Sequence, residues 1–237
     1  MKKFYLTLFF IAFALLYCSK DGSNNENDET KDKKPKGEFI VFKDAVAKAQ
    51  LVNLFDLNKD AELSYSEAAV VTSIKFGSTK DKGISMSNVK YLDEFQYFTG
   101  ITFFSMVPNA TNYISLVSFS IPKNVTQIYI GHGSTYRISY KNDWVLFSND
   151  ANKTLFKNLK TITCYSTTPP DGAVFLLLGP ECDNIVYVPK QSIEQYKASM
   201  QSTIEIMNKD VDKNPWAGAR KIDTQLMEKM FSRIKGF

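Results

Sequence analysis

LVSFSIPKNVTQI, residues 116–128, decides the predicted fold of this chain. An alternating apolar run leads into a proline corner, which is typical of a short strand that ends at a sharp turn. A variant of the stretch, IVYVPKQSIEQY, returns at residues 185–196 with the same Pro-Lys pair. The distance from Pro122 to Pro189 corresponds to about three turns of a solenoid whose repeat is about 20–29 residues.

Other short segments fit the same solenoid of stacked short strands. Val125 and Ile128 are expected to turn back inward after the corner, and residues 159–165, LKTITCY, read as a further strand. Each short strand has apolar residues that it cannot bury alone, so stacked copies would share one core. A β-sandwich also uses many short strands and is the alternative, but the repeated proline corner favours the solenoid.

The first 17 residues have the composition of a signal peptide. Two lysines form a charged start, and the apolar run that follows is too short to span a bilayer comfortably. Cys18 and an acidic polar stretch come directly after it, which resembles a bacterial lipoprotein signal. The resemblance implies a lipid on Cys18 and export to the outer membrane surface, although Tyr17 stands where a small residue is usual. A plain signal peptide or an uncleaved anchor is the alternative.

Residues 19–36 contain no aromatic or aliphatic side chain, so they cannot offset the entropy lost on ordering. We therefore expect residues 18–37 to be a flexible tether. Its charges nearly cancel, and the formal net charge of +4 falls further when the two N-terminal lysines are removed. This balance disfavours nucleic acid as a partner.

The remainder of the chain is expected to be a soluble monomer with a sizeable core, since 44% of all residues are apolar and 14% are aromatic. The longest later apolar run, AVFLLLG at residues 173–179, has the length of a strand and not of a membrane span.

The clearest chemical motif is DLNKDAELSYSE, residues 56–67, which separates two helical patterns at residues 44–55 and 66–74. It resembles a calcium loop of the EF-hand or dockerin type. Leu63 falls on the apolar position that anchors such a loop. The resemblance implies these ligands: Asp56, Asn58, Asp60, the backbone carbonyl of Glu62, Ser64 through water, and Glu67 with both carboxylate oxygens.

Ala61 departs from this motif, because the position normally holds a glycine with positive φ. An alanine there should cost about 1 kcal/mol and weaken calcium binding. In the alternative interpretation Ser64 and Glu67 form a capping box, and the earlier Asp and Asn residues are ordinary turn formers. That alternative leaves the D-x-N-x-D run unexplained, so we favour a structural calcium ion.

Four further segments extend the resemblance: LDEFQYFTGIT, SIPKNVTQI, LKTITCYSTTPP and IVYVPKQSIEQYK. Together they resemble BspA-like leucine-rich-repeat surface proteins of Bacteroidetes-type bacteria, over about residues 55–200. The resemblance implies an α/β fold, a right-handed leucine-rich-repeat solenoid of short strands. It also implies a non-enzymatic adhesion or binding role. Residues 130–156 depart from the repeat and are either a degenerate copy or an insertion.

The resulting domain organisation has five parts. After the signal peptide and the tether we expect a helical EF-hand-like unit at residues 38–83, the solenoid at 84–200 and a C-terminal helical cap at 201–237. Amphipathic patterns at residues 191–207 and 224–234 support helices near the C-terminus. Capping the open end of the solenoid is the favoured role for them, and binding a partner is the alternative.

No catalytic residues are predicted. Cys164 and Cys182 could stack on neighbouring turns and form a disulfide in an oxidising envelope, or remain buried free thiols. His132, the only histidine, lies between two glycines, and nothing places it beside either cysteine. The expected function is recognition of an extracellular protein or other macromolecule. A glycan-binding accessory of a polysaccharide-uptake system is the alternative, and an enzyme ranks third.

Overall fold

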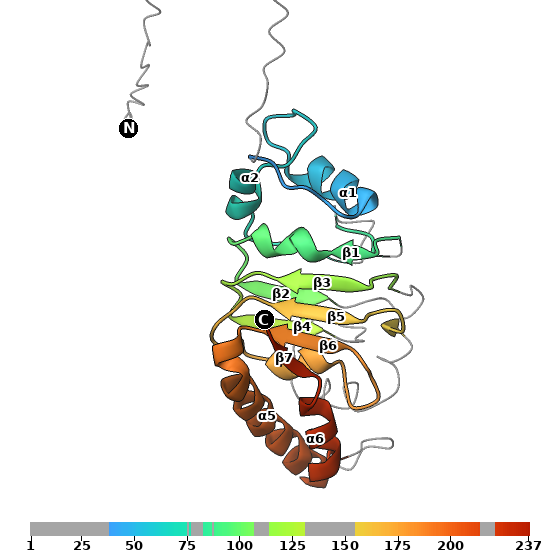
Figure 1. Ribbon diagram of the computed structural model, residues 1–237, viewed down its shortest axis with the longest axis vertical. Helices are drawn as coiled ribbons and strands as arrows, with labels where there is room; N and C mark the ends of the chain where they lie inside the picture. The colour runs from blue at the N-terminus through green and yellow to red at the C-terminus, as the bar shows by residue number, and fades with distance from the viewer. Residues whose placement is uncertain are drawn as a thin grey trace, which may run out of the picture. The chain divides into compact units, whose positions relative to one another are not determined.

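Two parallel sheets form the centre of the computed structural model, which describes residues 38–74, 76, 83–86, 88–106, 114–130, 155–213 and 221–237 (Figure 1). The larger sheet has the strand order β1 (Tyr91–Leu92), β3 (Ser118–Ile121), β5 (Thr161–Cys164), β6 (Ile185–Val188), β7 (Ile234–Gly236). The smaller sheet pairs β2 (Phe103–Met106) with β4 (Gln127–Ile130).

Helices flank the strands at both ends of the described chain. The α-helices are α1 (Ala45–Phe55), α2 (Tyr65–Val70), α5 (Ile193–Lys213) and α6 (Thr224–Phe231). Short 3₁₀ helices are η1 (Asp93–Tyr97), η2 (Ala173–Leu177) and η3 (Lys190–Ser192). The chain divides into two units, Met1–Pro35 and Lys36–Phe237, and every described residue belongs to the second. The predicted signal peptide, the tether, Cys18 and His132 lie outside the described residues.

The prediction of a leucine-rich-repeat solenoid is wrong. The described residues form a mixed α/β fold with a five-stranded and a two-stranded parallel sheet, and no solenoid is evident in them. Strands of the larger sheet begin at residues 91, 118, 161, 185 and 234, so their spacing is unequal. The connections also differ, since one carries η2 and another carries η3, α5 and α6. A solenoid needs equal units that stack in the same way, and the spacing of two prolines did not test this.

The strands themselves follow from the apolar pattern. Their parallel register aligns Leu92, Phe119, Ile162, Val186 and Ile234 in one row, and each of these side chains is buried. Successive residues of a strand point to opposite faces, so the intervening side chains lie on the other face of the sheet. One face of the larger sheet therefore covers the core.

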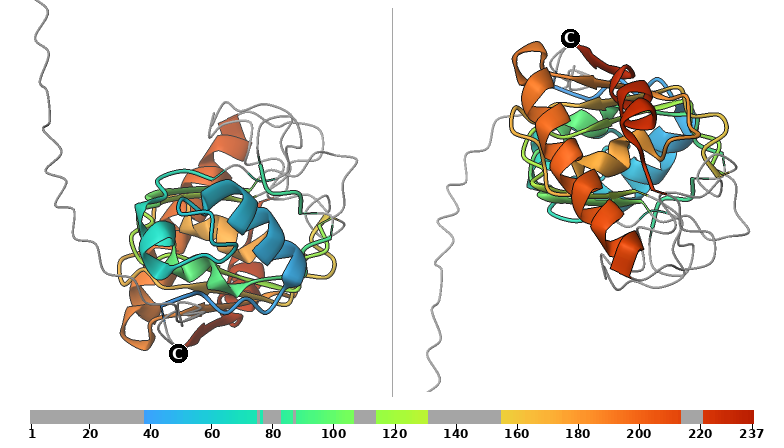
Figure 2. Two further views of the ribbon diagram at one scale, coloured as in Figure 1. Left: turned by 90° about the horizontal axis from the view of Figure 1, so that it is seen from above. Right: turned by 90° about the horizontal axis from the view of Figure 1, so that it is seen from below.

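The proline corner behaves as predicted. Pro122 ends β3, and its carbonyl accepts a hydrogen bond from the Val125 N–H at 3.3 Å. Val125 and Ile128 then turn inward, with exposed fractions of 1% and 2%. The corner carries the chain from the larger sheet to β4 in the smaller one, and Figure 2 shows strands on two opposite sides of the interior.

Two sequence assignments fail locally. The apolar run at residues 173–179 has the length of a strand, but it contains the buried 3₁₀ helix η2. A continuous apolar run has no periodicity that would distinguish a strand from a helix. Helix η2 starts at Gly172, whose φ is +76° and where a Cβ would lie 2.1 Å from the Ile128 carbonyl oxygen. The predicted last helix ends at Phe231, and β7 follows it as an edge strand paired with β6.

Cys164 and Cys182 are both buried free thiols, so the disulfide considered from the sequence is not formed. The Tyr196 hydroxyl lies 3.2 Å from the Cys164 sulfur, and burial raises the pKa of this thiol. A protonated thiol is a poor nucleophile, which agrees with a packing role.

Asp44 joins the helical unit to the larger sheet. Its Oδ1 accepts hydrogen bonds from the Val46 and Ala47 N–H groups and so caps α1. Its Oδ2 accepts from the N–H groups of Lys90 and Tyr91, at 2.6 and 3.1 Å. Burial alone would raise the pKa of Asp44, but these four bonds outweigh burial and hold the pKa below its usual value.

Candidate calcium-binding loop

The candidate site is the loop between α1 and α2, and its ends are held by local structure. Asp56 leaves α1 in an extended conformation, and Ser64 caps α2 by accepting the Glu67 N–H at 3.2 Å. Leu63 is fully buried, and its carbonyl accepts the Ile40 N–H at 2.8 Å. Leu63 is therefore part of the core, and its backbone pairs with the segment that precedes α1.

Inside the loop, three predicted ligand side chains fold back onto the loop's own backbone. The Asp56 carboxylate accepts hydrogen bonds from the N–H groups of Ala61 at 2.8 Å and Asp60 at 3.3 Å. Asn58 Oδ1 accepts from the Asp60 N–H, and Asp60 Oδ1 accepts from the Glu62 N–H. The loop is therefore wound around the oxygen atoms that the motif assigns to calcium.

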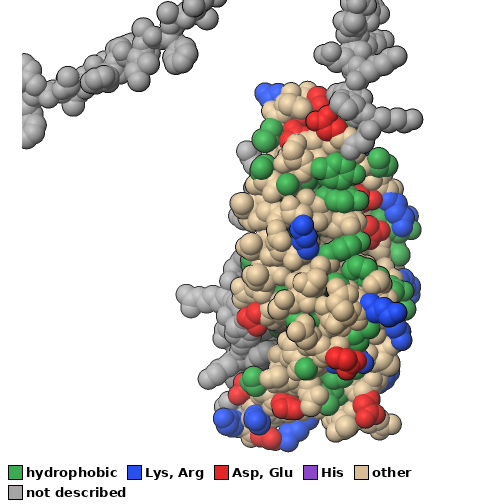
Figure 3. All heavy atoms as spheres, turned by 60° about the vertical axis from the view of Figure 1, so that its left-hand side comes forward, with side chains coloured by type: hydrophobic (Ala, Val, Ile, Leu, Met, Phe, Trp, Pro, Cys, Tyr) green, Lys and Arg blue, Asp and Glu red, His purple; other side chains and the backbone are tan. Residues whose placement is uncertain are grey.

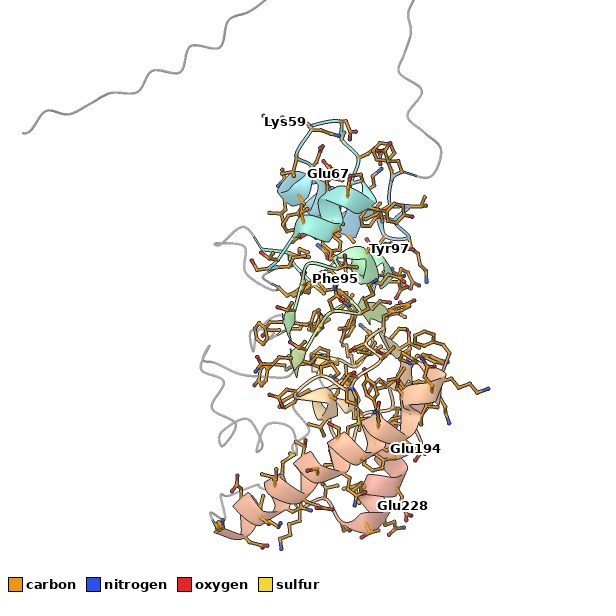
Figure 4. All side chains as sticks on the ribbon, turned by 90° about the vertical axis from the view of Figure 1, so that its left-hand side faces the viewer. Lys59, Glu67, Phe95, Tyr97, Glu194 and Glu228 are labelled. Atoms are coloured by element: carbon orange, nitrogen blue, oxygen red, sulfur yellow. The ribbon has the colours of Figure 1, made fainter. Side chains whose placement is uncertain are left out.

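Ala61 has φ = +65°, so the left-handed conformation predicted from the motif is confirmed. Lys59, two residues earlier, also has positive φ at 59°. A left-handed conformation costs a residue with a Cβ about 1–2 kcal/mol, and two of them in one loop mark a tightly constrained turn. Figure 4 shows Lys59 at the outer end of the loop and Glu67 on α2 beneath it.

Glu67 closes the loop. Its Oε1 accepts from the N–H groups of Leu57 at 2.9 Å and Asn58 at 3.4 Å, and its Oε2 accepts from the Ser64 N–H and hydroxyl at 2.9 and 2.7 Å. Burial alone would raise the pKa of Glu67, but these hydrogen bonds outweigh it and hold the pKa below its usual value. The carboxylate is thus kept charged, as a calcium ligand must be.

The capping box considered as the alternative is present as well. The two interpretations are therefore compatible, because the box involves only Ser64 and Glu67 and leaves the turn of Asp56, Asn58 and Asp60 in place. The Glu62 carboxylate pairs with Lys48 Nζ at 2.7 Å, so this side chain is directed to α1. Only its backbone carbonyl is left for a cation, as the motif implies.

The donor set fits calcium by chemistry, since carboxylate, amide, hydroxyl and carbonyl oxygens are the ligands this ion takes. Across the described residues, no group of three or more His, Cys, Asp or Glu side chains is arranged to hold a metal ion. Because both Glu67 oxygens already accept N–H or O–H groups, calcium would have to compete with these hydrogen bonds. That competition is consistent with weak binding.

Sequence reasoning missed the contact that connects this loop to the rest of the fold. Tyr65, the first residue of α2, packs edge-on against Tyr97 of η1, with ring centroids 4.8 Å apart. Gly100 lies close beneath α2, since a Cβ there would be 2.6 Å from the carbonyl oxygens of Ala69 and Val71. No sequence signal marks these contacts, because they join segments that are separate in the chain.

Comparison with protein-family models, with curated proteins and with solved structures finds no match for this chain. Among the helices that the structure describes, none is both long and apolar enough to cross a membrane.

Proposed function

We propose that this protein is a non-enzymatic binding module on the cell surface. In this proposal it is lipid-anchored through Cys18, carries a structural calcium ion in the loop at residues 56–67, and recognises an extracellular protein. The single observation that carries the binding role is the outer face of the five-stranded sheet.

The register of the parallel strands shows which residues lie on this outer face. One row contains Tyr91, Ser118, Thr161 and Ile185. The next row contains Ser120, Thr163, Tyr187 and Lys235. Ser118 and Ser120 are buried, so the accessible part of this face consists mainly of half-buried tyrosines and threonines. Such a composition is typical of recognition surfaces, because rigid rings supply contact area and hydroxyls supply hydrogen bonds. In Figure 1 the described α-helices lie above and below the sheet and not across its middle strands.

Ring geometry favours a protein over a glycan as the partner. A sugar platform needs two or three coplanar rings, whereas Tyr65 and Tyr97 meet at 87° and Tyr165 and Phe237 at 56°. The glycan-binding accessory remains the second candidate because exposed tyrosines suit both ligands. A pull-down with the tether-free domain against matrix proteins, together with a glycan array, tests this choice. Retention of matrix proteins supports the proposal, and retention of glycans alone contradicts it.

Two hollows lie on the helical unit. One is lined by α1 residues with Ser85 and Asn88 and contains no acid, base or thiol. The other is mainly apolar, and its one carboxylate, Glu67, is held by four hydrogen bonds. Neither hollow presents the pair of carboxylates that a glycoside hydrolase needs.

Calcium binding is predicted to depend on the loop side chains. Isothermal titration calorimetry should give one weak event with a Kd of about 10⁻⁴–10⁻³ M. Asp56→Asn and Glu67→Gln should abolish it, and Ala61→Gly should tighten it several-fold because glycine adopts positive φ without strain.

Glu62→Gln is the matched control for these variants. It removes a carboxylate from the same loop but keeps the backbone carbonyl, so its calcium affinity should equal that of the wild type. Absence of both binding heat and a calcium-dependent rise in Tm for the wild type would show that the loop is only a capped turn.

The calcium ion is predicted to act as a local clamp. At free calcium about 100 times the Kd, binding to the folded state alone adds about 2.7 kcal/mol of stability. Chelation should therefore increase hydrogen exchange in α1 and α2 while β3 and β5 stay protected. Uniform loss of protection across the described chain would contradict a local clamp.

Lipidation is predicted to place the protein at the membrane. Cys18→Ser should move the protein from the membrane fraction to the soluble fraction, because the acceptor thiol of the lipid is lost. Membrane partitioning that is the same in Cys18→Ser and the wild type would overturn the lipid anchor.

A further inference from the structure

The carboxyl ends of the parallel strands carry a row of aromatic side chains from four different elements. Tyr65 of α2 contacts Tyr97 of η1 at 4.8 Å, and Tyr165, just after β5, contacts Phe237, just after β7, at 5.2 Å between ring centroids. The two pairs are linked through Gln96, which precedes Tyr97 in the chain and whose side chain forms a hydrogen bond with Tyr165.

These rings are accessible to a partner. Tyr65 is 38% exposed and Phe237 is 53% exposed, while Tyr97 and Tyr165 are half-buried. Figure 3 shows hydrophobic side chains gathered in a band along the described part of the molecule, with both basic and acidic side chains beside them. Exposed apolar groups that form a continuous patch mark interaction sites more often than scattered ones do.

Lysines accompany the aromatic row. Lys123 and Lys190 follow the corner prolines after β3 and β6, and Lys235 lies on β7. All three are exposed, and none has an ion-pair partner within the described chain. Lys190 is adjacent to Phe237, whose backbone oxygen accepts the Lys190 N–H at 3.3 Å. We call the four aromatic residues and these three lysines the carboxyl-edge patch.

The acidic side chains near the patch are buried or paired, apart from Glu38. Glu94, beside Tyr97, is buried, and its Oε1 accepts the Lys43 N–H at 3.0 Å. Asp93 lies 3.8 Å from Lys43 Nζ and accepts the Ser118 hydroxyl, and Glu194 pairs with Lys197 at 2.9 Å. Glu38 is exposed near Tyr65, at the end of the row away from the three lysines. Exposed positive charge therefore lies at the Phe237 end of the patch, where Lys190 and Lys235 are located.

We propose that the carboxyl-edge patch binds an acidic, aromatic-containing polypeptide segment of a partner protein. The proposal rests on the proposed function and specifies its partner. Unpaired lysines select carboxylates, and they favour encounter with an acidic surface. Rings at steep angles to one another leave notches for side chains and give no flat platform for a sugar.

Fluorescence anisotropy with a labelled random copolymer of L-glutamate and L-tyrosine tests the proposal on the full mature chain. Lys190→Glu and Phe237→Ala should each weaken binding by about tenfold, as expected for charge reversal and for loss of an exposed aromatic anchor. Lys209→Glu on α5 and Phe103→Ala on β2 are matched controls, since both residues are exposed outside the patch. Their affinities should equal that of the wild type, and raised salt should weaken binding in all cases.

Three results would overturn the proposal: no binding of the copolymer, equal binding by patch and control variants, or patch-dependent binding of heparin in preference to the copolymer. Circular dichroism confirms that each variant is folded. The matrix-protein pull-down distinguishes failure of the patch proposal from failure of the proposed binding function. If matrix proteins are retained equally by the wild type and both patch variants, the patch proposal fails while the proposed binding function stands.

Discussion

Replacing Phe104 with alanine is expected to lower the free energy of unfolding by about 3–5 kcal/mol, which is typical of a phenylalanine removed from a close-packed core. Phe104 lies on β2 and is only 1% exposed. Its ring stacks on Phe119 of β3 at 5.6 Å and 12°, so it joins the smaller sheet to the larger one. It also contacts Phe76 and Phe95 at 5.3 and 5.5 Å.

The expected loss is large because the cavity cannot collapse. Its walls belong to two hydrogen-bonded sheets and η1, and each aromatic pair adds about 0.5–1.5 kcal/mol beyond burial. Phe103→Ala is the matched control, since Phe103 precedes it on β2 but is 41% exposed. In urea unfolding monitored by circular dichroism, this control should lose less than about 1 kcal/mol of unfolding free energy. Equal losses for the two variants would mean that Phe104 does not join the sheets.

Arg233→Met is expected to destabilise the protein by about 3–5 kcal/mol, because it leaves several buried acceptors without donors. The guanidinium of Arg233 donates to the carbonyls of Leu177, Gly179 and Cys182 at 3.1, 2.9 and 2.5 Å. It also donates to Asn184 Oδ1 at 3.2 Å. Burial lowers the pKa of Arg233, but the group stays protonated in proteins.

These bonds join the turn between α6 and β7 to the end of η2 and to the segment that follows it. Arg233→Lys keeps the charge but not the planar fork, so it should recover only part of the stability. Lys235→Met is the control, because Lys235 lies two residues later on β7 and is exposed. The prediction fails if the unfolding midpoints of Arg233→Met and Lys235→Met coincide.

Local patterns predicted individual elements well. The strand at Leu159–Tyr165 contains β5, the stretch at 116–128 contains β3 and its proline corner, and both predicted C-terminal helices exist as α5 and α6. Each of these elements depends on the periodicity of apolar side chains or on turn-forming residues within a short segment. Both can be read from the sequence alone.

Assembly of the elements was predicted wrongly. The distance between the proline corners at Pro122 and Pro189 was interpreted as about three repeats of a solenoid. The connection from β6 to β7 instead runs through η3, α5 and α6 before the chain returns to the sheet. Strand β7 has only three residues and is defined by its hydrogen bonds to β6, not by its own apolar pattern. Pairing between distant segments depends on packing that no single segment encodes.

By itself, the sequence determined the conformation of the loop at residues 56–67, because its Asp and Asn turn formers, its positive-φ turn at Ala61 and its capping Glu67 all lie within twelve consecutive positions. The carboxyl-edge patch was decided only by the tertiary structure. Its rings come from α2, η1 and the ends of β5 and β7. Parallel strands bring their carboxyl ends to one edge of a sheet whatever their separation in the chain, and that edge exists only after the strands have paired.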